Sequence, residues 1–252
     1  MQGATTQEAQ PLLLWMLPGL DGTGELLAPL AARLRGRFDA QTIAYPATPI
    51  GYRQLAHILA PNLPRDREFL IVGESFAGPL ALELAALHPP GLRGVVLSAA
   101  FARYPYAAVR ALAPLVRALP ASAAPMSLIT RYVLGRWDEP RCRHWLLEAI
   151  GDVPPAVLKG RVLASLTVDA TAALRSLDVP LLYLRASRDR VVGHAPSRAM
   201  LAAKPDTVVV DVEGPHFLLQ VATDACAATI AAFARRFVTG TAGPGTSPPP
   251  PR

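Results

Sequence analysis

Short runs of hydrophobic residues alternate along the chain with segments whose hydrophobic residues recur every three to four positions. The short runs predict six β-strands, over residues 12–17, 40–45, 69–73, 94–97, 180–184 and 207–212. Most of them are almost continuously apolar, as in parallel strands covered by helices on both faces. The helical periodicity predicts helices over 24–35, 52–60, 76–87 and 215–237. This alternation predicts an α/β domain with a parallel sheet and right-handed crossovers.

One long segment interrupts the alternation. Residues 101–175 contain no good strand pattern and are punctuated by prolines, which predicts several short helices. Helices inserted between two strands of a parallel sheet would cover its carboxyl edge, where ligands bind in open α/β sheets. We therefore expect a core of residues 11–100 and 176–238 with a helical cap at 101–175. The Gly/Pro-rich tail, 239–252, is expected to be disordered or extended.

A predicted buried strand runs directly into the sequence Gly73-Glu74-Ser75-Phe76-Ala77, and a predicted helix follows at once. This strand–turn–helix pattern is the setting of a nucleophile elbow, in which a serine is exposed at a tight turn. The turn needs small residues two positions before and two positions after the serine, and Gly73 and Ala77 are small. The alternative is that Ser75 only caps the helix, which is a common role of serine.

A serine needs a general base and an orienting acid to act as a nucleophile. His216 is the best placed of the five histidines, because it follows the last predicted strand and so lies at the same sheet edge as Ser75. Asp189 follows the fifth predicted strand and falls on a loop at that edge. The alternatives are a capping or buried role for His216 and, for Asp189, a solvated ion pair with Arg188 or Arg190.

The other titratable candidates are placed less well. The remaining histidines lie in or beside predicted helices, in the cap or on a loop: His57, His88, His144 and His194. The remaining acids lie inside or before a strand or in the cap: Asp211, Asp178 and Asp169.

The chain order Ser75, Asp189, His216 is the order expected of an α/β-hydrolase. Three features fit the expected elements: the elbow, the strand followed by Asp189 and Val191-Val192, and the Gly-Pro-His-Phe sequence around His216. Jointly they resemble the α/β-hydrolase superfamily over roughly residues 11–238. The resemblance is specific for the superfamily and not for a substrate.

The segment after the first predicted strand resembles the superfamily's loop after its third strand, with Pro18-Gly19 where many members have His-Gly. By position, the resemblance implies that the backbone N–H groups of Leu20 and Phe76 form an oxyanion hole. It also implies an α/β-hydrolase fold of about six parallel strands that lacks the usual first two, because the first predicted strand begins near residue 12.

The resemblance implies a serine hydrolase that cleaves a carboxylic ester or thioester through an acyl-enzyme on Ser75. Acyltransferases, perhydrolases and C–C hydrolases of the superfamily use the same three residue types, so the reaction stays open. A non-catalytic ligand-binding protein is a third alternative, against which the intact serine, aspartate and histidine argue. The sequence has no P-loop, no G-x-G-x-x-G after a strand and no metal-ligand cluster, so we expect no metal and no organic cofactor.

The hydrophobic fraction of 51% excludes a charge-rich disordered chain for most of the length. The net charge is +6. Residues 101–175 carry ten basic and five acidic residues, so most of the excess lies in the predicted cap. We therefore consider an anionic ester or acyl substrate, attracted by Arg110, Arg117, Arg131, Arg136, Arg141 and Arg143. The alternative is a solvated outer face, and no nucleic-acid partner is expected.

The remaining expectations concern location. Cys142 and Cys226 have no Cys or His partner at metal-ligand spacing, which favours free buried thiols in a reducing compartment over one disulfide. The polar start of the chain lacks the basic region of a signal peptide, and the apolar run at 12–17 is too short to span a bilayer. We expect a cytoplasmic protein without a membrane span; the oligomeric state is left open.

Overall fold

A six-stranded parallel sheet forms the centre of the molecule, with the strand order β2-β1-β3-β4-β5-β6. The strands are β1 (Leu13–Leu17), β2 (Asp39–Thr42), β3 (Phe69–Glu74), β4 (Leu92–Ser98), β5 (Leu181–Ala186) and β6 (Val208–Val212). The predicted sheet of six parallel strands is therefore confirmed. The computed structural model describes residues 11–121 and 126–238; the tail predicted to be disordered lies outside the described residues.

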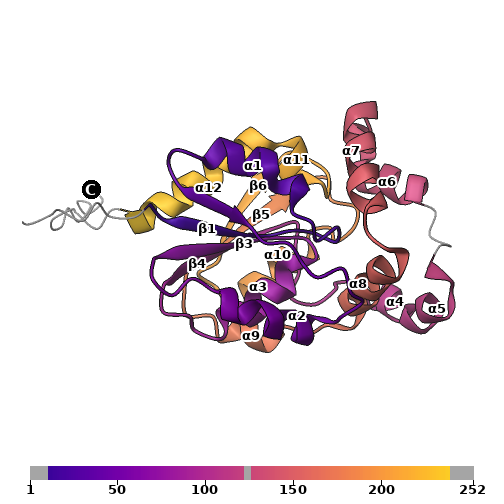
Figure 1. Ribbon diagram of the computed structural model, residues 1–252, viewed down its shortest axis with the longest axis horizontal. Helices are drawn as coiled ribbons and strands as arrows, with labels where there is room; N and C mark the ends of the chain where they lie inside the picture. The colour runs from indigo at the N-terminus through magenta and orange to yellow at the C-terminus, as the bar shows by residue number, and fades with distance from the viewer. Residues whose placement is uncertain (1–10, 122–125, 239–252) are drawn as a thin grey trace, which may run out of the picture.

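Helices cover both faces of the sheet (Figure 1). One face is covered by α1 (Ala28–Leu34), α11 (Leu218–Val221) and α12 (Thr223–Val238). The other face is covered by α2 (Tyr52–Leu59), α3 (Ala77–Ala85), α9 (Thr171–Arg175) and α10 (Ala195–Ala203). Trp15 packs in the core on the α2–α3 side, and its neighbours Leu14 and Met16 pack on the α12 side. Because both faces of β1 are buried, its sequence is an unbroken apolar run.

Three helical segments differ from the predicted ones. The segment predicted at 24–35 begins with a short 3-10 turn, η1 (Glu25–Leu27), before α1, and a second such turn, η2 (Ala60–Asn62), follows α2. The helix predicted at 215–237 is two helices, because the backbone leaves the helical conformation at Ala222, with φ −114° and ψ 41°. Helix α10 is absent from the predicted elements, since it buries only Pro196, Ser197 and Met200 and has little apolar periodicity.

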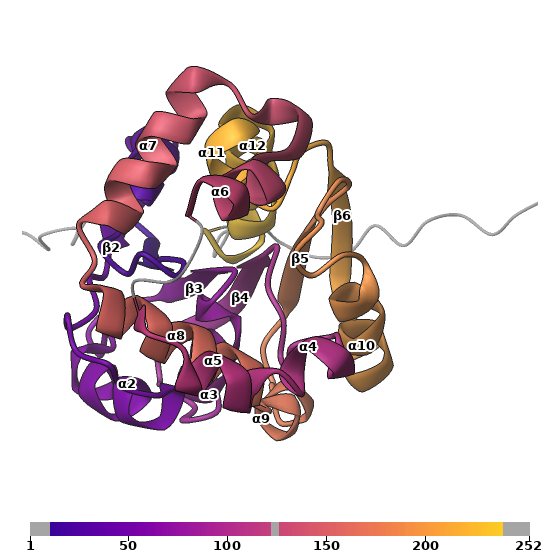
Figure 2. The same ribbon diagram turned by 90° about the vertical axis from the view of Figure 1, so that its right-hand side faces the viewer.

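The helices between β4 and β5, except α9, lie beyond the carboxyl ends of the strands (Figures 1 and 2). They are α4 (Ala107–Arg110), α5 (Ala113–Ala118), α6 (Met126–Leu134), a 3-10 turn η4 (Gly135–Trp137), α7 (Pro140–Gly151) and α8 (Pro155–Thr167). We call α4 to α8 the cap helices. The chain enters and leaves them where Arg103 and Asp169 form an antiparallel bridge and an ion pair of 3.5 Å. A separate cap domain with the limits 101–175 stays a prediction.

Gly78, in the first turn of α3, lets this helix approach the chain that follows β4. A Cβ at this position would lie 2.5 Å from the carbonyl oxygen of Phe101 and 2.9 Å from the Cβ of Ala100. We predict that Gly78→Ala lowers the free energy of unfolding by about 2 kcal/mol, because backbone atoms must move apart. Urea unfolding followed by circular dichroism measures this. Gly151→Ala is the matched control, since a Cβ there meets no atom within 4 Å; an equal loss in both variants would contradict the argument.

Candidate active site

Ser75 lies at the turn between β3 and α3, at the carboxyl edge of the sheet. Its φ of 48° is in the left-handed region that non-glycine residues rarely adopt. The turn is held on both sides, because the N–H of Ser75 donates to the carbonyl of Ser98 at 2.9 Å and the N–H of Gly78 donates to the carbonyl of Ser75 at 3.0 Å. This is the sharp strand–turn–helix geometry that the sequence predicts.

The two small residues of the turn are close to each other. A Cβ on Gly73 would lie 3.2 Å from the carbonyl oxygen of Ala77 and 3.2 Å from the Cβ of Ala81. Ala77 is itself fully buried without a clash. The turn thus accommodates alanine at position 77, whereas a side chain at position 73 would be crowded.

The serine, the histidine and the aspartate selected from the sequence come together in one hydrogen-bonded chain. The Oγ atom of Ser75 lies 2.7 Å from Nε2 of His216, and Nδ1 of His216 lies 2.8 Å from Oδ2 of Asp189. The other oxygen of Asp189 accepts the backbone N–H groups of Val191 and Val192 at 2.8 and 3.0 Å. The carboxylate is therefore held at both oxygens and can orient the imidazole.

The loops that carry Asp189 and His216 follow β5 and β6, which are paired strands. Two backbone hydrogen bonds of 3.0 Å join these loops, from Ser187 to the carbonyl of Val212 and from Arg188 to the carbonyl of Gly214. His216 lies in the loop before α11, and not at the start of one long helix as the sequence suggests.

Burial and charge shift the pKa values of His216 and Asp189 in opposite directions. Burial alone would lower the pKa of His216, but the charge and hydrogen bond of Asp189, together with the charge of Glu74, outweigh it and raise this pKa above its ordinary value of 6.5. Burial alone would raise the pKa of Asp189, and the charge and hydrogen bonds that it receives hold it below its ordinary value. Asp189 is therefore ionised when His216 titrates.

The histidines and aspartates that the sequence analysis placed less well lie outside the hydrogen-bonded chain of Ser75, His216 and Asp189. His57, His88, His144 and His194 are exposed. Asp211 pairs with Arg185, Asp178 with His88, and Asp169 with Arg103. Asp189 does not form the ion pair with Arg188 or Arg190 that was the alternative, because its two oxygens are bound as described above.

The backbone N–H groups of Leu20 and Phe76 are the oxyanion donors expected from the sequence. Both residues line the same cavity as Ser75 and His216. Within the described part of the chain, neither N–H donates a hydrogen bond. Preorganised donors of this kind can stabilise a developing oxyanion.

Arg161, on α8, holds the loop that carries the Leu20 N–H. Its buried guanidinium donates to the carbonyls of Leu20 at 2.9 Å, Asp21 at 2.5 Å and Pro46 at 3.2 Å. Gly22 makes room for it, since a Cβ there would lie 2.4 Å from a guanidinium nitrogen. Sequence reasoning missed this role and counted Arg161 only as cap charge, because its partner carbonyls are 115 to 141 positions away and carry no side-chain signal.

A second contact of α8 is made with Tyr52, which bonds the residue after Ser75. The hydroxyl of Tyr52 donates to the carbonyl of Phe76 at 2.8 Å, and the two rings stack with centroids 4.7 Å apart. The hydroxyl of Ser165 lies 3.3 Å from that of Tyr52, one helical turn after Arg161. Helix α8 thus contacts the loop of Leu20 directly and the segment of Phe76 through Tyr52.

A buried carboxyl group lies next to the serine in the chain. Glu74 is 5% exposed, and one of its oxygens accepts the side-chain N–H of Gln220 at 3.1 Å. Burial raises the pKa of Glu74 to about 7, with a further rise from the charge of Asp21, against the Gln220 hydrogen bond and the charge of His216. Glu74 therefore titrates near neutral pH, and its negative charge stabilises the protonated form of His216.

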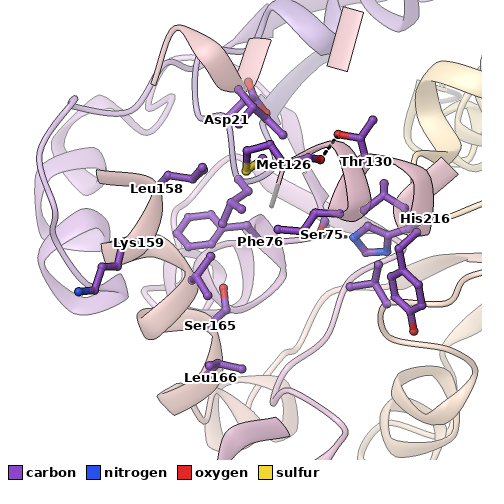
Figure 3. A pocket seen from close by; sticks show the side chains of 18 of the residues that line it. Asp21, Ser75, Phe76, Met126, Thr130, Leu158, Lys159, Ser165, Leu166 and His216 are labelled. Carbon is purple, nitrogen blue, oxygen red and sulfur yellow. Dashed lines mark hydrogen bonds between the residues drawn. The ribbon is translucent and has the colours of Figure 1, made fainter. Parts of the chain in front are cut away.

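A cavity of about 630 Å³ lies between Ser75 and the cap helices. Figure 3 shows Ser75 beside His216 in its wall, with Phe76 and Leu158 facing the same space. Most wall residues are apolar, which suits an apolar ligand. Lys159 is the one lysine or arginine in the described wall; its ammonium donates to the carbonyls of Arg117 and Leu119 and points away from Ser75.

The six cap arginines considered for an anionic substrate are absent from the described wall of this cavity. Five of them are exposed and Arg110 is half-buried. Their charge therefore belongs to the outer surface of the cap helices.

The described residues offer little for a metal ion, since they hold no group of three or more His, Cys, Asp or Glu side chains arranged around one point. Both cysteines are free thiols. Cys226 is buried, whereas Cys142 is only half-buried, in contrast to the expectation for it.

Several solved structures share the fold of this chain. An enol-lactonase from Burkholderia xenovorans LB400 is 18% identical, with a TM-score of 0.77 over 91% of this chain and 93% of that chain. A bromoperoxidase from Bacillus anthracis is 15% identical, with a TM-score of 0.78 over 90% and 93%. An esterase from Exiguobacterium antarcticum is 14% identical, with a TM-score of 0.76 over 90% and 93%. At these identities the likeness shows the fold and not the reaction.

Comparison with curated proteins gives no match. A family model described as serine aminopeptidase, S33, matches residues 52–216, which include the elbow, the cap helices and the loops of Asp189 and His216. This match covers more than half of the chain and agrees with the shared fold. The protein therefore belongs to the serine aminopeptidase S33 family of α/β-hydrolases.

Proposed function

We propose that the protein cleaves a carboxylic ester or thioester through an acyl-enzyme on Ser75. The observation that carries the proposal is the hydrogen-bonded chain from Ser75 through His216 to Asp189, with separations of 2.7 and 2.8 Å, in the wall of an apolar cavity. An apolar wall favours an acyl group over a charged peptide. The two carboxyl groups in it, those of Asp21 and Glu74, already accept hydrogen bonds from protein donors.

In the first half of the reaction, Ser75 Oγ attacks the carbonyl carbon while His216 Nε2 takes the hydroxyl proton. The carbonyl electrons move to oxygen, and the N–H groups of Leu20 and Phe76 hold the resulting oxyanion. When the tetrahedral intermediate collapses, the C–O or C–S bond breaks and His216 gives its proton to the leaving alcohol or thiol. Asp189 keeps the imidazole oriented and stabilises its positive charge.

In the second half, water replaces the leaving group. His216 takes a proton from the water as its oxygen attacks the acyl carbon, and the same two N–H groups hold the second oxyanion. Collapse breaks the bond to Ser75 Oγ, which recovers its proton from His216, and the carboxylic acid leaves. All the proton transfers use groups that are on the described chain.

Ser75→Ala tests the nucleophile directly. We predict a loss of esterase activity of at least about 10⁴-fold, since removing a member of such a set has effects of this size. A fluorophosphonate probe should label the wild-type protein and not this variant. Ser165→Ala is the control that keeps labelling, because its hydroxyl is held by Tyr52 and the carbonyl of Arg161 and not by a histidine. Labelling of the Ser75→Ala variant would show that Ser75 is not the nucleophile.

The substrate class is tested on a panel of p-nitrophenyl esters and acyl thioesters of graded chain length, with aminoacyl anilides beside them. We expect hydrolysis of the esters or thioesters, increasing with chain length in an apolar cavity. Hydrolysis of the anilides alone would favour an aminopeptidase and contradict the proposed ester cleavage.

The acidic limb of the pH profile reports the titration of His216, which must be neutral to act as a base. Because the pKa of this group is raised, kcat/KM should fall as the pH drops through a midpoint above 6.5. Glu74→Gln removes one charge that raises this pKa, so its midpoint should lie at lower pH than in the wild type. Glu148→Gln changes an exposed carboxylate on α7 and should leave the midpoint unchanged. A midpoint that Glu74→Gln raises would contradict this electrostatic account.

Arg161 is proposed as a positioning residue for the oxyanion loop. Arg161→Gln should lower kcat by roughly 10- to 100-fold with little change in KM, somewhat less than the loss of a whole oxyanion donor. Affinity for a boronic acid that mimics the tetrahedral intermediate should fall in parallel, and Arg161→Lys should recover part of both. Arg131→Gln, on the exposed face of α6, is the charge-matched control. A variant with a raised KM and unchanged affinity for the boronic acid would show a role in substrate binding instead.

A further inference from the structure

Exposed hydrophobic side chains are concentrated in and around α4, α5 and α6, the helices that also line the cavity above Ser75. Of the twelve large hydrophobic residues that are exposed in the described ranges, eight fall within 106–121 and 126–132. Leu115 is 55% exposed and Leu128 is 65% exposed. We call the exposed side chains of these two ranges the α4–α6 surface. A concentration of apolar side chains on a solvent-exposed surface marks a site of interaction.

The α4–α6 surface is continuous with the cavity above Ser75. Five of its residues are more than a third exposed and also line the cavity: Val109, Leu112, Leu119, Ile129 and Tyr132. An apolar chain can therefore pass from the outside to the serine along apolar side chains. Figure 2 looks onto this end of the molecule, with α4, α5 and α6 in front of the carboxyl ends of the strands.

The charge of the same helices has one sign. Residues 101–137 contain five arginines and no aspartate or glutamate. Arg103 and Arg136 pair with Asp169 and Glu213, which lie outside this range. Arg117 and Arg131 are exposed and form no ion pair with described residues. Cationic and apolar side chains together are the combination that binds an anionic lipid surface.

We propose that the α4–α6 surface docks on an anionic lipid surface, from which the acyl chain of a lipid ester enters the cavity. The leucines would lie among the acyl chains and the arginines at the headgroup phosphates. An acidic protein or an RNA would pair with the arginines but leave the leucines in water. The proposal rests on the proposed ester cleavage for the substrate, but docking is independent of the chemistry. It needs no spanning segment, and no helix among the described residues has the length and apolarity to cross a bilayer.

Docking is measured with full-length Ser75→Ala protein, so that turnover does not alter the lipid. Co-sedimentation compares vesicles of phosphatidylcholine alone with vesicles that also contain phosphatidylglycerol. We expect binding to the phosphatidylglycerol vesicles that weakens with added salt. Leu115→Asp combined with Leu128→Asp should reduce the affinity at least about tenfold, because two exposed leucines that would enter the acyl-chain region are replaced by carboxylates. Arg117→Gln combined with Arg131→Gln should reduce both the affinity and its salt dependence.

The matched controls lie at the opposite edge of the sheet. Leu87 is 57% exposed and follows the end of α3, and Arg65 is exposed before β3. Leu87→Asp and Arg65→Gln should bind the vesicles like the parent protein.

Hydrolysis of p-nitrophenyl acetate in vesicle-free buffer, measured in proteins that keep Ser75, tests the proposed function separately. Leu115 and Leu128 do not line the cavity, so their replacement should leave this hydrolysis unchanged.

Three results would overturn the docking proposal while leaving the ester cleavage intact. The first is an absence of binding, or equal binding to both kinds of vesicle. The second is binding that the leucine and arginine variants do not weaken. The third is a stable dimer, measured by sedimentation velocity, that Leu115→Asp with Leu128→Asp converts to a monomer, because a second copy of the chain then covers the surface.

Discussion

All six strands run in the same direction, so the loop after each strand opens at the same edge of the sheet. This constraint brings Ser75, Asp189 and His216 together although up to 141 positions separate them. It also places the loop after β1 next to the elbow after β3, because these two strands are neighbours. The chain turns from β1 outward to β2 and then returns to β3, which makes this the switch point at which open α/β sheets bind ligands.

The cap helices contact the carboxyl edge of the sheet at two separate places. On α8, Arg161 bonds the loop that carries the Leu20 N–H, and Ser165 contacts Tyr52, whose hydroxyl donates to the Phe76 carbonyl. On the other side, α7 joins a small apolar cluster with η1 and the loop of His216, where Trp145 packs edge-on against Phe217 at 5.9 Å. Each anchor contacts a segment that borders the serine. The geometry around Ser75 is therefore a joint property of the sheet and the cap helices.

The elements that could be predicted are those with a local signal. The strands are recognisable because burial on both faces makes them continuous apolar runs, and the elbow because a tight turn requires small residues at 73 and 77. Asp189 and His216 follow from strand order, since each comes directly after a strand. The break at Ala222 leaves no such signal, because alanine favours a helix. Arg161 could not be identified either, since its partners are backbone carbonyls, which every residue has.

The close approach of Arg161 to Gly22 couples these two positions during evolution. The guanidinium occupies the space that a side chain at position 22 would need, and the left-handed backbone there, with φ of 66°, adds a second penalty. A side chain at 22 would displace the guanidinium of Arg161 from the carbonyls of Leu20 and Asp21. The two positions should therefore vary together among related sequences, with glycine at 22 wherever arginine occupies 161.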